Sequence, residues 1–125
     1  MARLQLDLSD VVSFHSYDSP AEFRKRVKSL QWLRRPVLCT EYMARGNGST
    51  FMGTLPIARK YKVAAINWGL VQGKTLTNLP WDSWQNPYTD HAPAVWFHEV
   101  FYTDGRPYRV EEVKFIRQMT GKAGK

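Results

Sequence analysis

Short apolar segments alternate three times with helix-forming segments along this chain. The apolar segments are residues 10–17, 36–42 and 62–69, and the second and third are apolar almost throughout, as parallel strands covered on both faces are. Strands that alternate with helices at this spacing indicate right-handed crossovers and a parallel sheet. The sequence therefore predicts an α/β protein with about three βα units and parallel strands.

Local signals mark where the helices begin and end. Residues 19–22 form a capping box with a proline at the first helical position, which predicts a helix over residues 20–33. A second helix is expected after the loop that follows the second strand, and Pro56 within it should kink this helix or shift its start. A last helix is predicted over residues 110–119, whereas the first nine residues read as strand or linker.

Polar and aromatic residues end all three predicted strands. They are His15 and Tyr17 on the first strand, Glu41 and Tyr42 on the second, and Asn67 and Trp68 on the third. Neighbouring parallel strands lie about 4.8 Å apart, and their carboxyl ends share the edge of the sheet where α/β proteins build active sites. Taken singly, Glu41 could be a surface carboxylate and His15 a structural histidine. Their coincidence at equivalent positions predicts one shared pocket.

A long segment, residues 70–93, follows the third strand without a clear helix or strand pattern. It is longer than ordinary connections in compact domains, which marks it as a candidate functional segment. It contains Trp81, Trp84 and Tyr88, and aromatic residues make up 14% of the chain, more than packing alone requires. Some of these rings are therefore expected to face a ligand.

The charge of the chain bears on its partners. A net charge of +7 is compatible with nucleic-acid binding, but the basic residues alternate with apolar ones, as on solvated helix faces. We therefore expect no nucleic-acid partner. No apolar run approaches the roughly 20 residues of a membrane span, and the N-terminus lacks the pattern of a signal peptide. The sequence thus predicts a soluble chain with no membrane partner.

Several other chemistries fit this sequence poorly. A metal site needs three or four converging ligands, and His15, His91 and His98 are dispersed, so neither a metal nor another cofactor is expected. Cys39 lies inside an apolar run, where a nucleophilic thiolate is disfavoured. The loop "GNGS" lacks the spacing and the lysine of a phosphate-binding loop.

Five stretches of the sequence together resemble a known family. They are "SFHSY", "PVLCTEYMARGNGSTF", "INWGLVQGKT", "LPWDSW" and "WFHEVFYTDGRPY". They resemble the C-terminal part, strands six to eight, of clan A glycoside hydrolases, closest to the cellulase-like glycoside hydrolase family 5. Members of this family are (β/α)8 TIM barrels that cleave β-linked sugars with retention. The resemblance covers nearly the whole chain and implies that residues 1–125 are a single partial-barrel glycoside hydrolase domain.

The resemblance also implies roles for the residues at the strand ends. Glu41 matches the nucleophile of strand seven, and His15 and Tyr17 match the pair on strand six that lies beside it. Trp68 matches a tryptophan that forms a floor under the sugar ring. As weaker expectations, Asn67, Arg45 and Asn47 would reach sugar hydroxyls, and Trp81 would extend the cleft.

One part of the family pattern is missing from this chain. A retaining glycosidase needs an acid/base carboxyl about 5 to 5.5 Å from the nucleophile, and the family supplies it from strand four, which this sequence lacks. Asp18 and Glu99 are the substitutes that we considered, but the sequence places neither beside Glu41. Two functions therefore stay open: a retaining hydrolase of β-1,4-glucan-like plant polysaccharide or oligosaccharide, with the activity of the isolated chain undecided, and a non-catalytic carbohydrate-binding barrel fragment.

Three βα units cannot close a barrel. Their inward face and both edges of the sheet would lie in water, and such surfaces favour association. We therefore expect a homo-oligomer, or a chain that forms part of a larger barrel.

Overall fold

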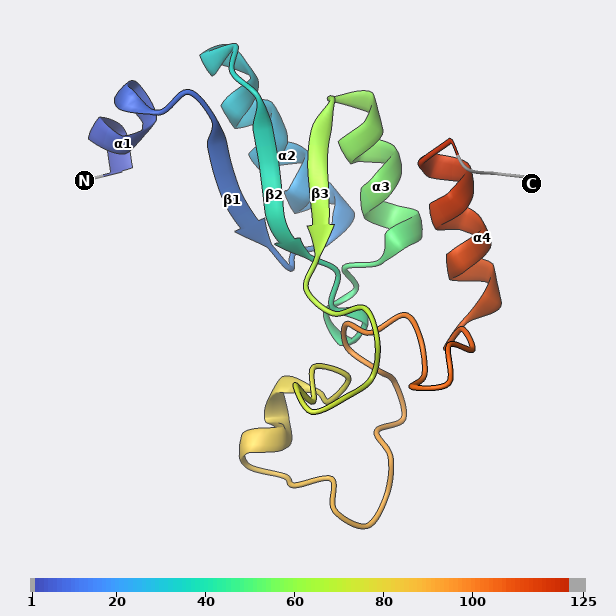
Figure 1. Ribbon diagram of the computed structural model, residues 1–125. Helices are drawn as coiled ribbons and strands as arrows, with labels where there is room; N and C mark the ends of the chain where they lie inside the picture. Colours follow the sequence, from blue (N-terminus) through green and yellow to red (C-terminus); the bar gives the residue numbers. More distant parts are fainter. Residues whose placement is uncertain (1, 122–125) are drawn as a thin grey trace.

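The computed structural model of the chain describes residues 2–121 (Figure 1). The regular elements are α1 (Ala2–Leu8), β1 (Val12–Ser16), α2 (Pro20–Leu30), β2 (Val37–Tyr42), α3 (Phe51–Lys60), β3 (Val63–Asn67) and α4 (Val110–Met119). Three short 3-10 helices, η1 (Gln31–Leu33), η2 (Arg45–Asn47) and η3 (Trp81–Trp84), lie between them. No helix among these residues combines the length and the apolar character that crossing a bilayer requires.

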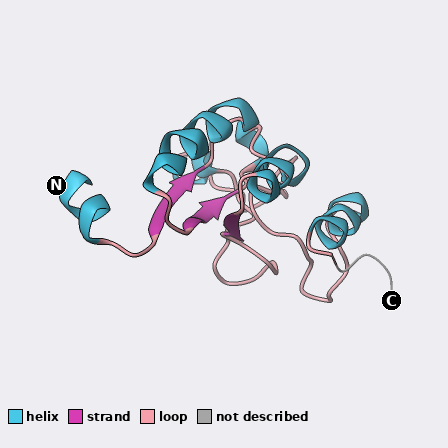
Figure 2. Ribbon diagram, turned by 90° about the horizontal axis from the view of Figure 1, so that it is seen from above, coloured by secondary structure: helices cyan, strands magenta, loops and turns pink. Residues whose placement is uncertain are grey.

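The three strands form one parallel sheet in the order β1-β2-β3, so the predicted α/β class is confirmed. The strands pair in register from their first core residues, with Val12 opposite Val37 and Val37 opposite Val63. Helices α2 and α3 lie over the same face of the sheet (Figure 2). The sheet is therefore wound in one direction, with each crossover helix on the same side.

The capping signals select the helix starts that the sequence predicted. The Ser19 side chain accepts a hydrogen bond from the Glu22 backbone N–H, and α2 begins at Pro20. Thr50 caps α3 by accepting the backbone N–H of Gly53 at 3.2 Å. Pro56 lies inside α3 and does not move its start, which corrects the expected shift.

The N-terminal residues are helical, which corrects their interpretation as strand or linker. The guanidinium of Arg35 donates to the backbone carbonyls of Leu6, Asp7 and Ser9 at the end of α1, at 2.8 Å for Ser9 and 3.2 Å for Asp7. A cation at this end of a helix binds the carbonyls that have no partner within the helix and complements the helix dipole. Because Arg35 lies far along the chain, no local pattern could have indicated this helix end.

The core lies between the sheet and its helices. Its fully or nearly fully buried members include Val12, Phe23, Val27, Val37, Cys39, Phe51, Ile57, Ala58 and Val63. The other face of the sheet is different, because no described helix covers it (Figure 2). Ile66 is 50% exposed there and Trp68 53%. The coverage of both faces that the apolar runs of the second and third strands predicted is therefore not found within residues 2–121, and one face lies open, as expected for three βα units.

The connection from β3 to α4 extends below the carboxyl ends of the strands and continues to residue 109, beyond the predicted limit at Pro93 (Figure 1). Within it, residues 96–100 are all buried although they belong to no helix or strand. Arg45 holds this segment: its side chain donates to the carbonyls of Trp96 and Glu99, each at 3.0 Å. The same guanidinium pairs with Glu112 of α4, with its Nε 2.9 Å from one carboxylate oxygen.

The ion pair between Arg45 and Glu112 provides a test of how this loop is held. The two side chains are only 2% and 3% exposed, so Glu112→Gln would leave a buried guanidinium without its counter-charge. We expect this variant to lose about 3–5 kcal/mol of unfolding free energy, measured by urea denaturation. The matched control is Asp104→Asn, which breaks the exposed pair of Asp104 with Arg106 and should leave stability unchanged. A Glu112→Gln protein as stable as the parent would contradict this account.

Candidate active site

A bulge in β2 decides which way Glu41 points. In a regular strand Glu41 would face the same side as Cys39, which is buried in the core. The pairing with β1 instead shifts by one residue, from Phe14 opposite Cys39 to His15 opposite Glu41. Thr40 is the extra residue, and its hydroxyl donates to the Phe14 carbonyl at 3.3 Å. Bulges re-aim side chains in this way, and here the carboxylate is turned to the open face of the sheet, beside His15.

Two side chains from the end of β1 hold the Glu41 carboxylate. The Tyr17 hydroxyl donates to Oε2 of Glu41 at 2.8 Å, and Nδ1 of His15 lies 3.3 Å from the same oxygen. Burial and the bond to Glu41 raise the pKa of Tyr17, so its phenol remains a donor at neutral pH. The Glu41 side chain is 20% exposed, and no hydrogen bond from a described residue reaches its Oε1. The structure thus brings together His15, Tyr17 and Glu41, with one carboxylate oxygen oriented and the other available.

A buried histidine joins a tryptophan to this group. His98 has its Nδ1 2.6 Å from the carbonyl of Met43, which can only accept, so Nδ1 carries the proton. Nε2 is then an acceptor, and the indole N–H of Trp81 donates to it at 3.3 Å. The Trp81 ring meets Tyr17 edge-on, with centroids 5.2 Å apart. Trp81 is therefore fixed against the residue that orients Glu41.

His98 has no role predicted from the sequence, because the three histidines lie far apart along the chain. One signal could have found it. In "WFHEV", residues 96–100, a histidine and a glutamate interrupt an apolar run. All five of these residues are buried. A polar pair inside such a run needs partners, and His98 finds them in Met43, Trp81 and Tyr17.

A cleft of about 1070 Å³ opens beside these residues. Trp68, at the end of β3, Trp81 and His98 line it, together with residues of the loop from 72 to 93. Trp68 and Trp81 are 53% and 45% exposed, so both present ring surface to a ligand. Glu41 does not itself line the cleft, but Tyr17 connects it to Trp81 and His98.

Three predicted sugar contacts lie elsewhere. Arg45 is buried and engaged with Glu112 and backbone carbonyls, so the prediction that it reaches a sugar hydroxyl is wrong. The side-chain amide of Asn67 donates to the carbonyls of Gly69 and His98 and so holds the connection that follows β3. Asn67 is not one of the described residues that line the cleft. Asn47 is exposed in η2 and is likewise outside that set.

The other ionisable groups near the site are occupied or buried. Asp18 accepts hydrogen bonds from Ser16 and Arg26, each at 2.8 Å, and these lower its pKa, so it is ionised. Glu99 is fully buried, and burial raises its pKa. Burial also raises the pKa of Cys39 to about 11, so its thiol stays protonated at neutral pH. Within residues 2–121 no group of three or more His, Cys, Asp or Glu side chains is arranged to hold a metal ion.

The chain was compared with known proteins at three levels. No protein-family model matches it, and neither a curated protein nor a solved structure shows significant similarity to it.

The buried, neutral His98 predicts a pH dependence of stability. Burial lowers the pKa of His98 in the folded state, while nearby Arg45 disfavours and Glu41 favours the imidazolium. As the pH falls below about 6.5, the unfolded chain takes up this proton first, so the unfolding free energy falls. We expect the stability of the parent relative to His98→Gln to decrease between about pH 7.5 and about pH 5.5 in urea titrations. The variant retains His15 and His91, so a pH-independent difference would show that His98 is not held neutral.

Proposed function

We propose that this chain carries the nucleophile of a retaining β-glycosidase that acts on β-1,4-glucan-like chains, within a partial (β/α)8 barrel. The observation on which this depends is the placement of Glu41. It lies at the carboxyl end of a parallel strand, and its Oε2 is bound by the Tyr17 hydroxyl at 2.8 Å. Tyr17 in turn contacts Trp81 and His98, which line the cleft. The resemblance of the sequence motifs to family 5 glycoside hydrolases supports the same role.

The proposed chemistry uses each of these groups. An oxygen of Glu41 attacks the anomeric carbon, the bond to the leaving oxygen breaks, and a glycosyl ester forms that water then hydrolyses. The Tyr17 hydroxyl fixes the direction of the Glu41 carboxylate, and Nδ1 of His15 lies 3.3 Å from the same oxygen. Trp68 and Trp81 offer flat rings to the apolar face of a pyranose.

Neither Asp18 nor Glu99, the two candidates for the acid that protonates the leaving group, is placed for that task. Asp18 is ionised and paired with Arg26, and Glu99 is fully buried beside Thr77, whose hydroxyl donates to it. Neither carboxyl is presented to the cleft. This observation favours a second candidate function for the isolated chain, which is carbohydrate binding without turnover.

The form of the sheet supports a larger barrel. A sheet with both crossover helices on one face covers its other face by curving into a closed barrel. Here that face exposes His15, Ile66 and Trp68, and β1 and β3 are both edge strands. We infer that this face and these edges pack against further βα units, from a second copy of the chain or from the rest of a larger barrel, and that those units contribute the missing acid.

Covalent labelling tests the nucleophile without needing the acid. A dinitrophenolate leaving group requires little protonation, so a dinitrophenyl 2-deoxy-2-fluoro-β-cellobioside should label the chain once, and mass spectrometry of peptides should locate the sugar on Glu41. Glu41→Gln should not be labelled, whereas Glu111→Gln, at an exposed carboxylate of α4, should be labelled like the parent. A label on a different residue would contradict the assignment. Binding of cello-oligosaccharides without any label would support the binding-only function.

Self-association is tested through Ile66, which lies half exposed on the open sheet face. Light scattering after size exclusion should give the parent a mass above the 14.5 kDa of one chain, and Ile66→Lys should shift it towards that value. Met52→Lys is the matched control, because Met52 is 40% exposed on α3, away from the open face. A monodisperse parent monomer would argue against a second copy as the partner.

A further inference from the structure

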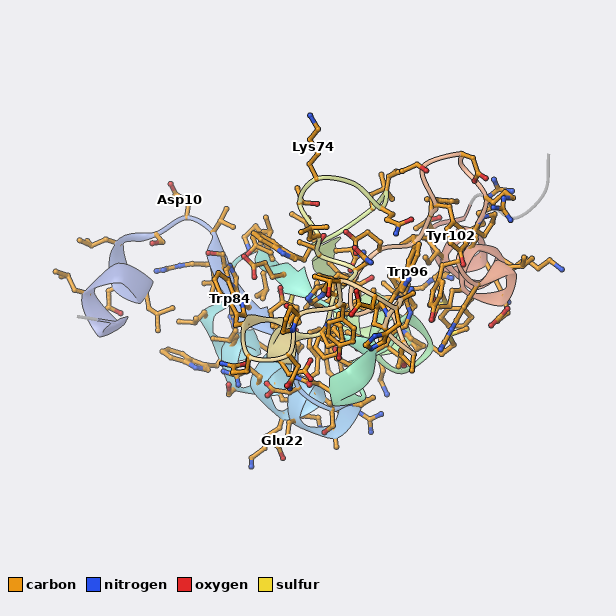
Figure 3. All side chains as sticks on the ribbon, turned by 90° about the horizontal axis from the view of Figure 1, so that it is seen from below. Asp10, Glu22, Lys74, Trp84, Trp96 and Tyr102 are labelled. Carbon is orange, nitrogen blue, oxygen red and sulfur yellow. The ribbon has the colours of Figure 1, made fainter. Side chains whose placement is uncertain are left out.

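The cleft lined by Trp68 and Trp81 has neither lysine nor arginine among its described lining residues. The chain contains 18 Lys and Arg residues, yet among the described residues that line the cleft none is Lys or Arg. Lys74 belongs to the loop that forms one wall, but it projects away from the body of the molecule (Figure 3). The lining carboxylate is Asp90. An anionic ligand would find no Lys or Arg counter-charge here and would meet the carboxylate of Asp90, so this lining disfavours anions.

Apart from Asp90 and the two histidines, His91 and His98, the lining side chains are aromatic, apolar or polar without charge. Trp68, Trp81, Trp84 and Tyr88 supply rings, and Thr, Ser, Asn and Gln side chains supply hydrogen-bonding groups between them. A pyranose has an apolar C–H face and a rim of hydroxyls, so it can stack on a ring and hydrogen-bond at its edge at the same time. A purely apolar ligand would leave the polar groups of the wall without partners.

Trp84 stands out because it is 89% exposed and yet lies on a loop held by several hydrogen bonds. The backbone N–H groups of Gln85 and Asn86 donate to the Asp82 carbonyl at 2.9 and 2.8 Å. The Asp82 carboxylate accepts from the Tyr88 hydroxyl at 3.2 Å and from the Asn86 side chain at 3.4 Å. Asp82 therefore closes the loop on itself, and Trp84 is held in solvent instead of folding onto the core.

Trp84 and Trp81 have different surroundings. Trp81 is bound to His98 and meets Tyr17, so it belongs to the group around Glu41. Trp84 lines the same cleft from the opposite end of η3, outside those contacts. The cleft thus has an inner aromatic group next to the carboxylate and an outer one at Trp84 and Tyr88.

We propose that Trp84, with Tyr88, is an outer binding platform for a further uncharged sugar ring, so that the cleft selects glycan chains by length. This inference rests on the proposed function. A sugar bound at Trp68 and Trp81 next to Glu41 would place the following rings of the same chain along the cleft towards Trp84.

The test measures binding of neutral cello-oligosaccharides of increasing length by isothermal titration calorimetry, in the Glu41→Gln background so that no turnover occurs. Affinity should rise with length, and adding Trp84→Ala should lower it about tenfold for long chains and leave the disaccharide unaffected. Oligogalacturonate, an anionic probe of similar length, should bind far more weakly than the neutral chains.

Trp32→Ala is the matched control, because Trp32 is an equally isolated tryptophan, 71% exposed in η1 and not part of the cleft. It should leave all affinities unchanged. The proposal of an outer platform would be overturned if Trp84→Ala left the affinity for long chains unaltered, or if it lowered the affinity equally at every length. A changed assembly mass with unchanged sugar binding would overturn it as well. These outcomes differ from failure of the proposed function, which is read from the label on Glu41: a length-dependent loss in Trp84→Ala without any label would uphold the platform and reject catalysis.

Discussion

The buried guanidinium of Arg45 organises the part of this protein that lies beyond the sheet. It pairs with Glu112 of α4 and holds the carbonyls of Trp96 and Glu99, while the rings of Phe51 and Tyr108 lie within 5.8 and 5.0 Å of it. Residues 96–100 belong to no strand, so their buried backbone needs other partners. The Arg45 side chain satisfies the carbonyls of Trp96 and Glu99, whereas Phe97 and Val100 bond to backbone groups of other segments. A buried charge whose three nitrogens all donate hydrogen bonds tolerates little displacement, and this helps to fix the course of the segment under the strand ends. His98 reaches Tyr17 and Trp81 because of that course.

The site thus combines two kinds of support. The sheet supplies Glu41, and the bulge at Thr40 turns its carboxylate out of the core side and onto the face occupied by His15. The loop supplies the aromatic wall, because His98 uses one nitrogen to bind Met43 and the other to hold Trp81. Neither support depends on regular secondary structure at the point of contact. Both depend on polar groups that are satisfied by residues from a different part of the chain, which is how a precise site is held on irregular backbone.

The proposed function makes this arrangement one part of a larger barrel. Under the proposed function, the oriented carboxylate and the aromatic wall of a cleft without lysine or arginine would serve the binding and covalent capture of a sugar. Neither Asp18 nor Glu99 is placed to supply the proton for the leaving group. The open sheet face is the direction from which further βα units could bring an acid, because Glu41 and His15 are turned towards it. The acid that the proposed reaction needs and the cover that the sheet lacks would therefore both be supplied at the open face of the sheet.

The sequence by itself determined the alternation of strands and helices, the start of α2 at its capping box and the bounds of α4, because these follow from interactions within a few residues. It also indicated that His15, Tyr17 and Glu41 would meet, since parallel strands end at one edge. Only the tertiary structure decided the rest. The end of α1 depends on hydrogen bonds from Arg35, and the burial of Arg45 depends on its ion pair with Glu112. The exposure of one sheet face depends on which elements cover it. The sequence of an apolar strand is the same whether or not a second layer covers its face. A charged residue is predicted to lie on the surface unless its partner, far along the chain, is known to lie beside it.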